Sequence, residues 1–368
     1  MNLEINHQSV FEHFDVKGSF ISCQPTGKGH INDTLLVKTD DPGCPGYILQ
    51  RINHGIFTNV PKLMENISRV TAHLKNKLAQ SGGENSNEKV LDLVRTKQGL
   101  TYVQDAAGNY WRCYHYCPHS PEKEGAVSPE QAFEGGKALG KFQALLADLP
   151  GEPLFEILPD FHNLAWRLNN LHKAEKENAV GRLQEVSELV EKIHLRENEM
   201  LKVHQLGLEG KIPVRITHND TKFNNILFNE NGKAICIIDL DTVMNGYVLN
   251  DFGDAVRTLS NTTREDEQDV SGLKFNMELY KKFAAGYISE ARHFLTETET
   301  SLLAFSSKLL TYIMAVRFMT DYLAGDVYYK INHPLQNLYR AKNQIRLIEC
   351  MEEQFEEMEN VIRLLATI

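Results

Sequence analysis

The part of the chain that decides the fold reads Ile216-Thr217-His218-Asn219-Asp220-Thr221-Lys222-Phe223-Asn224-Asn225-Ile226-Leu227-Phe228, followed after a turn by Ala234-Ile235-Cys236-Ile237-Ile238-Asp239. Residues 226–228 and 234–238 are apolar and flank the polar turn 229–232, which predicts a β-hairpin. A hairpin returns the chain to its starting point, so we expect Asp239 to lie beside Asn225. Carboxylate and amide side chains thus gather where an apolar strand ends, and a hairpin with merely polar turns does not explain them.

The spacing of His218, Asp220 and Asn225 fits the pattern H-x-D-x-x-x-x-N, which is typical of phosphoryl transfer. Such transfer needs positioning and charge neutralisation more than covalent chemistry. We predict that Asp220 orients the attacking hydroxyl and accepts its proton late. Asn225 and Asp239 are predicted to bind Mg²⁺, a hard cation that prefers oxygen ligands, with ATP as the phosphoryl donor. We interpret His218 as a buried brace of the loop rather than a proton carrier.

Two further carboxylates lie downstream of this block. Asp251-Phe252-Gly253 spells D-F-G, a metal-binding motif of protein kinases, but it lies past the hairpin and leads into a predicted helix. Asp239 is better placed, because it directly follows the second strand of the hairpin. We therefore predict a structural role for Asp251, as a helix cap or a brace of the catalytic loop. Asp241 is open to two interpretations, a contact with substrate or metal and an ordinary turn carboxylate.

The order of the elements predicts an α+β, protein-kinase-like fold with two lobes. A small β-rich lobe with one helix is expected at 1–116 for nucleotide binding, and a larger, mainly helical lobe at 117–368 for catalysis and substrate binding. The strands expected in the first lobe are 18–24, 34–38, 47–50, 90–94, 100–104 and 110–116, with a helix after the N-cap Asn59. The helical patterns of the second lobe are 130–147, 174–206, 274–291, 297–325 and 335–367.

The predicted nucleotide contacts lie mainly in the first lobe. Gly27 and Gly29 stand in the turn between the first two strands, where glycine lets the backbone approach phosphate closely. His30 follows them at the expected mouth of the cleft, within reach of phosphate or sugar. Tyr114 and Tyr116 belong to the segment against which we expect the adenine to lie.

Composition narrows the class of protein. Of the 368 residues, 42% are apolar and 24% charged, which is ordinary for a globular protein long enough for two lobes. The net charge of -10 disfavours nucleic acid and anionic membranes as partners. The six cysteines are scattered along the chain, which is typical of reduced thiols. No signal peptide is visible. Lys308 and Arg317 interrupt the most apolar stretch, which therefore predicts a core helix. We expect a cytoplasmic protein and favour a monomer.

Further motifs accompany the block 217–242: Gly29-His30-Ile31-Asn32, Tyr47-Ile48-Leu49-Gln50, Asp251-Phe252-Gly253-Asp254, Arg317-Phe318 and Asp321-Tyr322-Leu323. With them, nearly the whole chain resembles the aminoglycoside phosphotransferase and choline kinase superfamily, and within it the N-acetylhexosamine 1-kinases. That resemblance implies transfer of a phosphoryl group from ATP to the anomeric hydroxyl of N-acetylglucosamine or N-acetylgalactosamine. It also implies contacts to the sugar from Asp220, His30, Arg317 and Tyr328.

One position departs from the wider fold. The third strand should carry a lysine that pairs with the phosphates and with a glutamate on the helix, but Gln50 stands there, and Arg51 is expected on the opposite face. Because the hexosamine kinases look similar here, we keep Gln50 in the nucleotide site, and Lys28 or Lys38 could compensate. Glu65, the candidate glutamate of the helix, is more typical of a solvated residue.

Several alternatives remain open. The same machinery could phosphorylate choline, homoserine or an aminoglycoside, and Asp254, Asp321 and Asp326 would suit a cationic acceptor. A nucleotide- or sugar-binding regulator without turnover is supported only by the missing lysine. A protein kinase is disfavoured, because no A-P-E segment follows Asp239. Arg317, inside an apolar helix, is either a sugar ligand or the salt-bridge partner of Asp321 four residues on.

Overall fold

The computed structural model describes residues 6–27, 31–80, 90–119 and 127–367. The chain divides into two compact units, each assembled from several stretches. The first contains Met1–Glu124, Asp148–Leu158 and Ile226–Met244, and the second contains Gly125–Ala147, Pro159–Asn225 and Asn245–Ile368. The first is built on an antiparallel sheet and the larger second unit on helices, which confirms the predicted α+β class. The lobe boundary after residue 116 stays a prediction.

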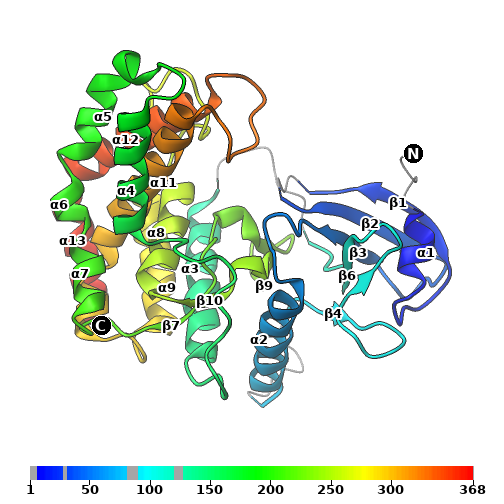
Figure 1. The fold of residues 1–368 in the computed structure, drawn as a ribbon. Coiled ribbons are helices and arrows are strands. Elements are labelled where there is room, and N and C mark those ends of the chain that lie inside the picture. Colours follow the sequence, from blue (N-terminus) through cyan, green and yellow to red (C-terminus); the bar gives the residue numbers. More distant parts are fainter. Residues whose placement is uncertain (1–5, 28–30, 81–89, 120–126, 368) are drawn as a thin grey trace. The chain divides into compact units, whose positions relative to one another are not determined.

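The sheet of the first unit has six antiparallel strands (Figure 1). Five follow the order β1-β2-β3-β6-β4, and β5 pairs with β6. The strands are β1 (Phe20–Pro25), β2 (Asp33–Thr39), β3 (Tyr47–Ile52), β4 (Leu93–Val94), β5 (Val103–Gln104) and β6 (Tyr110–His115). All predicted strands are present, although β4 and β5 are much shorter than the predicted stretches 90–94 and 100–104.

The two faces of the sheet have different surroundings, because alternate residues of a strand point to opposite sides. A short helix, α1 (His7–Phe11), which the sequence had not indicated, covers one face and contributes Phe11 to a buried core. The residues of β3 and β6 in this core are odd-numbered: Tyr47, Leu49, Trp111 and Cys113. The even-numbered residues, Gln50 and Arg112 among them, therefore lie on the opposite face.

Helix α2 (Val60–Gln80) ties together separate stretches of the first unit. Its start is capped as predicted, because Asn59 Oδ1 accepts a hydrogen bond from Lys62 N at 3.2 Å. Its apolar face is buried, and Asn66 and Thr71 are polar residues buried among the apolar ones. Asn66 donates to the carbonyl oxygens of Phe155 at 2.8 Å and Val243 at 3.1 Å. The helix thereby fixes Val243, which lies in the segment that follows the predicted hairpin 226–238.

The predicted hairpin is present as β8 (Ile226–Phe228) and β9 (Ala234–Ile237). Its strands pair antiparallel, with Ile226 opposite Ile237. The residue before Ile226 is Asn225, and Asp239 comes two residues after Ile237. The hairpin itself is present as predicted, whereas the placement of Asp239 beside Asn225 stays a prediction.

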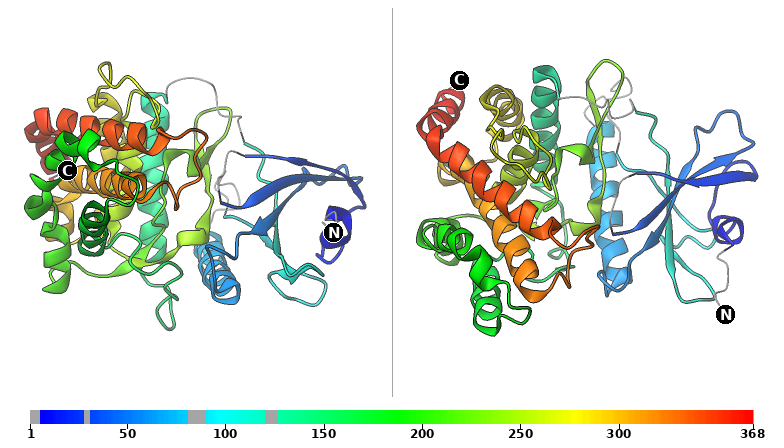
Figure 2. Two further views of the ribbon diagram at one scale, coloured as in Figure 1. Left: turned by 45° about the horizontal axis from the view of Figure 1, so that its top comes forward. Right: turned by 90° about the horizontal axis from the view of Figure 1, so that it is seen from above.

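The second unit is mainly helical, with α11 (Leu303–Ala324) at its centre. This helix contacts α4 (Leu164–Glu177), α8 (Val248–Leu259) and α12 (Gln336–Glu353) (Figure 2). Most of its side chains are buried. It is the core helix predicted from the sequence, and in the described part of the chain no helix is long and apolar enough to cross a membrane. The remaining elements are α3 (Pro129–Leu146), α9 (Met277–Ala291), α10 (Glu297–Ser301), α13 (Phe355–Ala366) and the paired strands β7 (Arg215–Thr217) and β10 (Met244–Gly246).

The predicted continuous helix 174–206 is wrong. Helix α4 begins ten residues earlier, after the N-cap Asn163, and ends at Asn178, whose φ of 39° and ψ of 47° are left-handed. Shorter turns then follow: η2 (Leu183–Val186), α5 (Ser187–His194), α6 (Glu197–Met200) and α7 (Lys202–Leu208). Apolar periodicity persisted through these breaks because each short helix buries the same side against the core. The stretches 297–325 and 335–367 are likewise interrupted, at Leu302 and Gln354.

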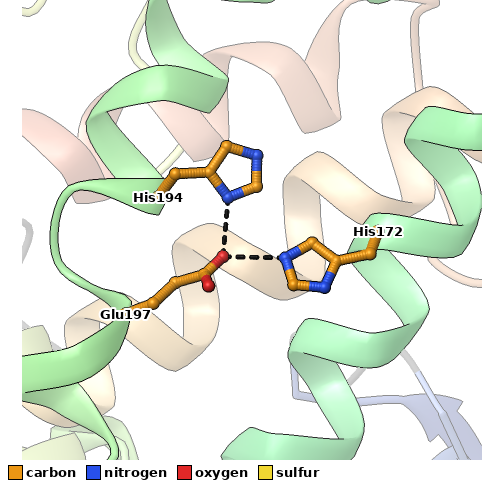
Figure 3. A group of neighbouring side chains, drawn as sticks. All are labelled: His172, His194 and Glu197. Carbon is orange, nitrogen blue, oxygen red and sulfur yellow. Dashed lines mark hydrogen bonds and ion pairs between the residues drawn. The ribbon is translucent and has the colours of Figure 1, made fainter.

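A cluster of two histidines and a glutamate joins three of these short helices (Figure 3). One oxygen of Glu197 lies 2.9 Å from His172 Nε2 and 2.6 Å from His194 Nδ1, and His194 Nε2 lies 3.0 Å from Glu175. These are hydrogen-bond lengths, whereas two ligands of one tetrahedral zinc ion lie about 3.3 Å apart. Although enclosure of the ring opposes the charge, the carboxylates of Glu197 and Glu175 raise the pKa of His194. The cluster is therefore an ion-pair network that fastens α4, α5 and α6.

Helices α3 and α9 approach each other closely through glycine (Figure 1). A Cβ added at Gly286 of α9 would lie 1.9 Å from the carbonyl oxygen of Phe133, and one at Gly136 of α3 would lie 2.1 Å from that of Phe283. Only hydrogen atoms fit in these contacts. The close approach lets Tyr287 of α9 donate a hydrogen bond to Gln143 of α3 at 2.5 Å.

We predict that Gly286→Ala destabilises the protein despite the better helix propensity of alanine. The gain in propensity is about 1 kcal/mol, whereas overpacking a rigid contact costs about 1–3 kcal/mol or more, so the free energy of unfolding should fall. Urea unfolding measures it. Gly272→Ala is the matched control, because nothing lies within 4 Å of its Cβ position. Equal stabilities of the two variants would contradict the close packing of α3 on α9.

Candidate active site

The loop 217–225 of the second unit, which contains the predicted catalytic residue Asp220, is held by one buried carboxylate. Asp251, in α8, accepts hydrogen bonds from the backbone N–H groups of His218 at 2.9 Å and Asn219 at 2.7 Å. Gln143 donates to the same carboxylate at 2.8 Å, and Thr221 Oγ1 donates to the Asp251 carbonyl oxygen at 2.6 Å. Asp251 is therefore a brace of the loop, one of the two structural roles predicted for it.

The D-F-G spelling at 251–253 belongs to helix packing. Phe252 is fully buried and contacts the ring of Tyr287 edge-on, with centroids 5.0 Å apart. Gly253 allows α11 to come close, because a Cβ there would lie 2.2 Å from the carbonyl oxygen of Ser306. All three residues thus have structural reasons for their identity, and none requires a metal ion.

His218 and Asn219 shape the backbone just before Asp220. The His218 side chain is fully buried, and its Nδ1 accepts a hydrogen bond from the N–H of Asp220 at 3.3 Å, which confirms that it braces the loop. Asn219 has a φ of 67°, a left-handed conformation that non-glycine residues adopt only where the surroundings impose it. The hydrogen bond from the Asn219 N–H to Asp251 and the one from the Asp220 N–H to His218 provide that constraint.

Asp220 is paired with Lys222, a residue to which the sequence analysis gave no role. The lysine Nζ lies 2.9 Å from Asp220 Oδ1 and 3.2 Å from Oδ2. Burial alone would raise the pKa of Asp220, but the Lys222 ammonium outweighs it and holds the pKa below its ordinary value. Asp220 is therefore ionised at neutral pH and ready to accept a hydrogen bond from a hydroxyl. The signal in the sequence was the position of Lys222, two residues after the acid in the same tight loop.

Asn225 is oriented by the loop that it closes. Its Nδ2 donates to the carbonyl oxygen of Asp220 at 2.8 Å, so its own amide oxygen points elsewhere. Phe223, in the same turn η3 (Phe223–Asn225), is buried and donates its N–H to Thr258 at 3.0 Å. An amide oxygen on an anchored turn is a suitable ligand for Mg²⁺.

Asp239 and Asp241 differ sharply in their surroundings. Asp239 is exposed and has a φ of 63° and ψ of 53°, again left-handed. Asp241 is buried; one oxygen is ion-paired with Arg112, and the other accepts a hydrogen bond from Asn32 at 2.6 Å. Both oxygens of Asp241 are thus engaged within the protein, and the exposed Asp239 stays the predicted carboxylate ligand of a hard cation. The open question about Asp241 is answered in favour of a structural role.

The predicted nucleotide residues lie in different places of the first unit. Gln50 and Tyr114 lie on the sheet face opposite the α1 core, and Gln50 accepts a hydrogen bond from Arg112 at 2.9 Å. Tyr116 follows β6, is half-buried, and donates its N–H to Gly46 at 3.0 Å. Gly27 has a φ of 76° in an exposed turn, and no atom of the described residues lies within 4 Å of the place where a Cβ would stand. Lys28, Gly29 and His30 lie outside the described residues, and Glu65 is an exposed residue paired with Lys62 at 2.8 Å.

Two arginines and a histidine gather near Asp220 in the second unit. Arg317 is buried, with its guanidinium 4.9 Å from the ring centroid of Phe161, and Arg167 donates to the Phe161 carbonyl oxygen at 3.0 Å. The ring of His162 lies beside the loop, its Nε2 donating to the carbonyl oxygen of Asn219 at 2.8 Å. Among the described residues, Nε of each arginine and Nδ1 of the histidine are buried without a hydrogen-bond partner.

The charges in this cluster influence one another. Loss of water around the ring, together with the charges of Arg317 and Arg167, lowers the pKa of His162 to about 3 although its backbone hydrogen bond opposes this. Burial and the Arg317 charge lower the pKa of Arg167 to about 10. At neutral pH His162 is therefore neutral, with Nδ1 as an acceptor, and both arginines are charged. The sequence gave no signal for His162 or Arg167, because neither belongs to a motif.

Arg317 does not pair with Asp321, so the salt-bridge interpretation is wrong. Asp321 accepts hydrogen bonds from the backbone N–H groups of Tyr328 at 2.7 Å and Tyr329 at 2.9 Å, and from Asn337 at 2.8 Å. Across the described parts of the chain, no carboxylate lies within 4.0 Å of the guanidinium of Arg317 or Arg167. Tyr328 itself is largely exposed, with its backbone fixed by Asp321.

The chain belongs to the phosphotransferase enzyme family (APH), whose family model matches residues 22–295. Solved structures share its fold over nearly their full length. An aminoglycoside phosphotransferase from Alicyclobacillus acidocaldarius has 13% identity and a TM-score of 0.60, with 97% of this chain and 98% of that chain covered. A microcompartment-associated aminopropanol kinase has 16% identity and a TM-score of 0.57, with 96% and 97% covered.

A third similar structure is an amicoumacin kinase in complex with AMP-PNP, Ca²⁺ and Ami. It has 15% identity and a TM-score of 0.56, with 96% of this chain and 94% of that chain covered. Together these findings confirm the protein-kinase-like fold and the phosphotransferase class. They leave the acceptor of this chain to be argued from its own residues, since likeness at this level of identity concerns the fold.

We predict that removing the Asp251 brace destabilises the protein. In Asp251→Ala two backbone N–H groups and the Gln143 amide lose their buried acceptor, and each unsatisfied group costs about 1–3 kcal/mol. The free energy of unfolding, measured with urea, should fall by about 3 kcal/mol or more. Asp269→Ala, at an exposed carboxylate, is the control and should change it little. Equal stabilities would refute the brace.

We also predict a shift in the pH dependence of turnover in Lys222→Met. The acid limb of the kcat/KM profile should lie below the ordinary range of an aspartate, because the Lys222 charge lowers the pKa of Asp220. Without that charge, burial raises the pKa, so activity is lost at a higher pH as the solution is acidified. Lys222→Arg should keep the limb near its original position. An acid limb that stays in place in Lys222→Met would contradict the pairing.

Proposed function

We propose that this protein is an ATP-dependent kinase that phosphorylates the anomeric hydroxyl of an N-acetylhexosamine, with Mg²⁺ as the metal. The observation that carries the acceptor assignment is the pair of guanidinium groups, Arg317 and Arg167, which have no carboxylate partner in the described chain and share the surroundings of His162 with Asp220. A buried cation needs a partner, and hydroxyl and carbonyl oxygens of a sugar can supply the missing acceptors.

The same arginines argue against a cationic acceptor. Two like charges about 5 Å apart repel by about 3 kcal/mol at an effective dielectric constant of 20. Choline, an aminopropanol or an aminoglycoside would place its ammonium group among these cations. The carboxylates that could have favoured such acceptors have partners: Asp321 as described above, Asp326 with Arg182 at 2.6 Å, and Asp254, through Oδ1, with Arg257 at 2.9 Å. Among the described residues, Asp254 Oδ2 is buried without a hydrogen-bond partner.

The proposed roles follow from the contacts of each residue. Asp220, ionised beside Lys222, accepts a hydrogen bond from the anomeric hydroxyl and takes its proton late in the transfer. Asn225 and Asp239 offer one amide and one carboxylate oxygen, a donor set that fits Mg²⁺, which when bound would neutralise phosphate charge. His162 Nδ1 accepts a hydrogen bond from a sugar hydroxyl, and Arg317 donates to an oxygen of the acceptor. His30 and Tyr328 are kept as further sugar contacts, and Gly27, Gly29, Gln50, Tyr114 and Tyr116 as residues of the nucleotide site.

We predict turnover confined to N-acetylhexosamines. ADP release is measured with Mg-ATP and N-acetylglucosamine, N-acetylgalactosamine, glucose, choline, homoserine or kanamycin, with Asp220→Asn as the control. Asp220→Asn should lower kcat by several orders of magnitude with little change in ATP affinity. Turnover with choline or kanamycin would keep the chemistry but refute the acceptor. ATP binding without any turnover would support a regulator instead.

A variant of the arginine cluster separates acceptor binding from nucleotide binding. Arg317→Met should raise KM for the N-acetylhexosamine by about 10–100-fold, because a hydrogen bond from a charged donor contributes about 1.5–3 kcal/mol, and leave KM for ATP nearly unchanged. Arg196→Met, which breaks a half-buried ion pair with Glu352, is the control and should change neither constant. An unchanged acceptor KM in Arg317→Met would exclude this arginine from the acceptor site.

A further inference from the structure

Gln50 occupies the strand position where the wider fold carries a lysine, and the structure explains the amide. Its Oε1 accepts a hydrogen bond from Arg112 Nε at 2.9 Å, and its Nε2 donates to Thr34 Oγ1 at 2.9 Å. Gln50 and Arg112 are direct cross-strand partners in β3 and β6. A lysine at position 50 would place a second positive charge against the guanidinium. Gln50 and Arg112 are therefore compatible neighbours. The positive charge on this face of the sheet is carried by Arg112 of β6 instead of by residue 50 of β3.

Arg112 forms a buried ion pair with Asp241. Its side chain is 1% exposed, and Nη1 is ion-paired with Asp241, whose side chain is 3% exposed. The guanidinium also lies 5.3 Å from the ring centroid of Tyr114. Removing either charge alone would leave the other buried and unpaired, which costs about 3–5 kcal/mol. The pair is thus a strong link between the sheet and the segment that carries Asp241.

That segment is the one that sets Asp239. Asp241 belongs to the turn η4 (Leu240–Thr242), which starts directly after Asp239. The turn is fixed on two more sides, because Asn32 donates to Asp241 at 2.6 Å and Asn66 donates to the Val243 carbonyl oxygen at 3.1 Å. The left-handed backbone of Asp239 costs about 1–3 kcal/mol and persists only where such contacts impose it.

We propose that Arg112 is a positioning residue for the metal site: through Asp241 it holds the Asp239 carboxylate in the place where it binds the metal ion of the nucleotide complex. This inference rests on the proposed function. Arg112 then acts on the metal site through the turn η4 and does not bind a phosphate directly. Its Nε is engaged by Gln50 and its Nη1 by Asp241. Lys38, the other cation considered, lies four residues along β2 from Thr34, about 13 Å away.

The test measures binding of Mn²⁺ and ADP without turnover. Mn²⁺ affinity is determined by electron paramagnetic resonance at saturating ADP, and ADP affinity by calorimetry in EDTA. Loss of a group that orients a metal ligand lowers metal affinity by about 10–100-fold. We expect a fall of that size in Arg112→Met and in Asp241→Asn, partial recovery in Arg112→Lys, and an ADP affinity in EDTA that stays within about twofold.

A second variant guards against simple misfolding. Arg112→Met strands a buried carboxylate, whereas the double variant Arg112→Met/Asp241→Asn removes both charges and should be the more stable of the two. It should still show the loss of Mn²⁺ affinity. Arg215→Met is the matched control, since it breaks a comparable pair of the second unit, Arg215 Nε to Glu299 Oε1 at 2.8 Å, and should leave Mn²⁺ and ADP binding unchanged.

Unchanged Mn²⁺ affinity in the folded double variant would overturn the positioning role. A marked fall of ADP affinity in EDTA would also overturn it, because Arg112 would then be a direct phosphate ligand. Wild-type protein that binds neither Mn²⁺ nor ADP would refute the proposed nucleotide chemistry itself, which is a different result.

Discussion

A buried carboxylate needs hydrogen-bond donors, and in the second unit the backbone N–H groups of His218 and Asn219 donate to Asp251. The loop in turn gains a fixed path, including the left-handed Asn219, that an unsupported chain would not adopt. The brace is itself held by Gln143, and Gln143 by Tyr287, across the glycine contact of α3 with α9. The position of Asp220 therefore depends on helix packing far along the sequence.

The first unit uses the same device a second time. Asp241 is buried, accepts hydrogen bonds from Arg112 and Asn32, and follows the left-handed Asp239, the proposed metal ligand. In both places a buried carboxylate supports a left-handed residue at the candidate site: Asn219, directly before the proposed catalytic Asp220, and Asp239, the proposed metal ligand. Such strain is stable only because removing a donor from the buried acid costs more than relaxing one backbone residue would gain.

The sequence was sufficient for what local pattern determines. The hairpin 226–238, the N-cap Asn59 and the bracing roles of His218 and Asp251 were predicted correctly, because turn residues, spacing and apolar runs define them. The continuous helix 174–206 was wrong, since apolar periodicity does not register a left-handed break such as Asn178. Arg112, Arg167 and His162 could not be assigned, because their roles come from partners brought close by the fold rather than by spacing.

The missing lysine illustrates the difference between a motif and a charge. A motif fixes a residue type at one position of one strand, whereas the electrostatics of a sheet face depend on which cation is present, and cross-strand neighbours lie only about 5 Å apart. Gln50 does not match the lysine of the motif, but its cross-strand partner Arg112 supplies a cation on the same face of the sheet. The same reasoning applies to the proposed acceptor: structures at 13–16% identity share the fold, but the buried guanidinium groups of Arg167 and Arg317, which have no carboxylate partner among the described residues, are features of this chain. Substrate class is therefore argued from charges without partners, which the shared fold does not determine.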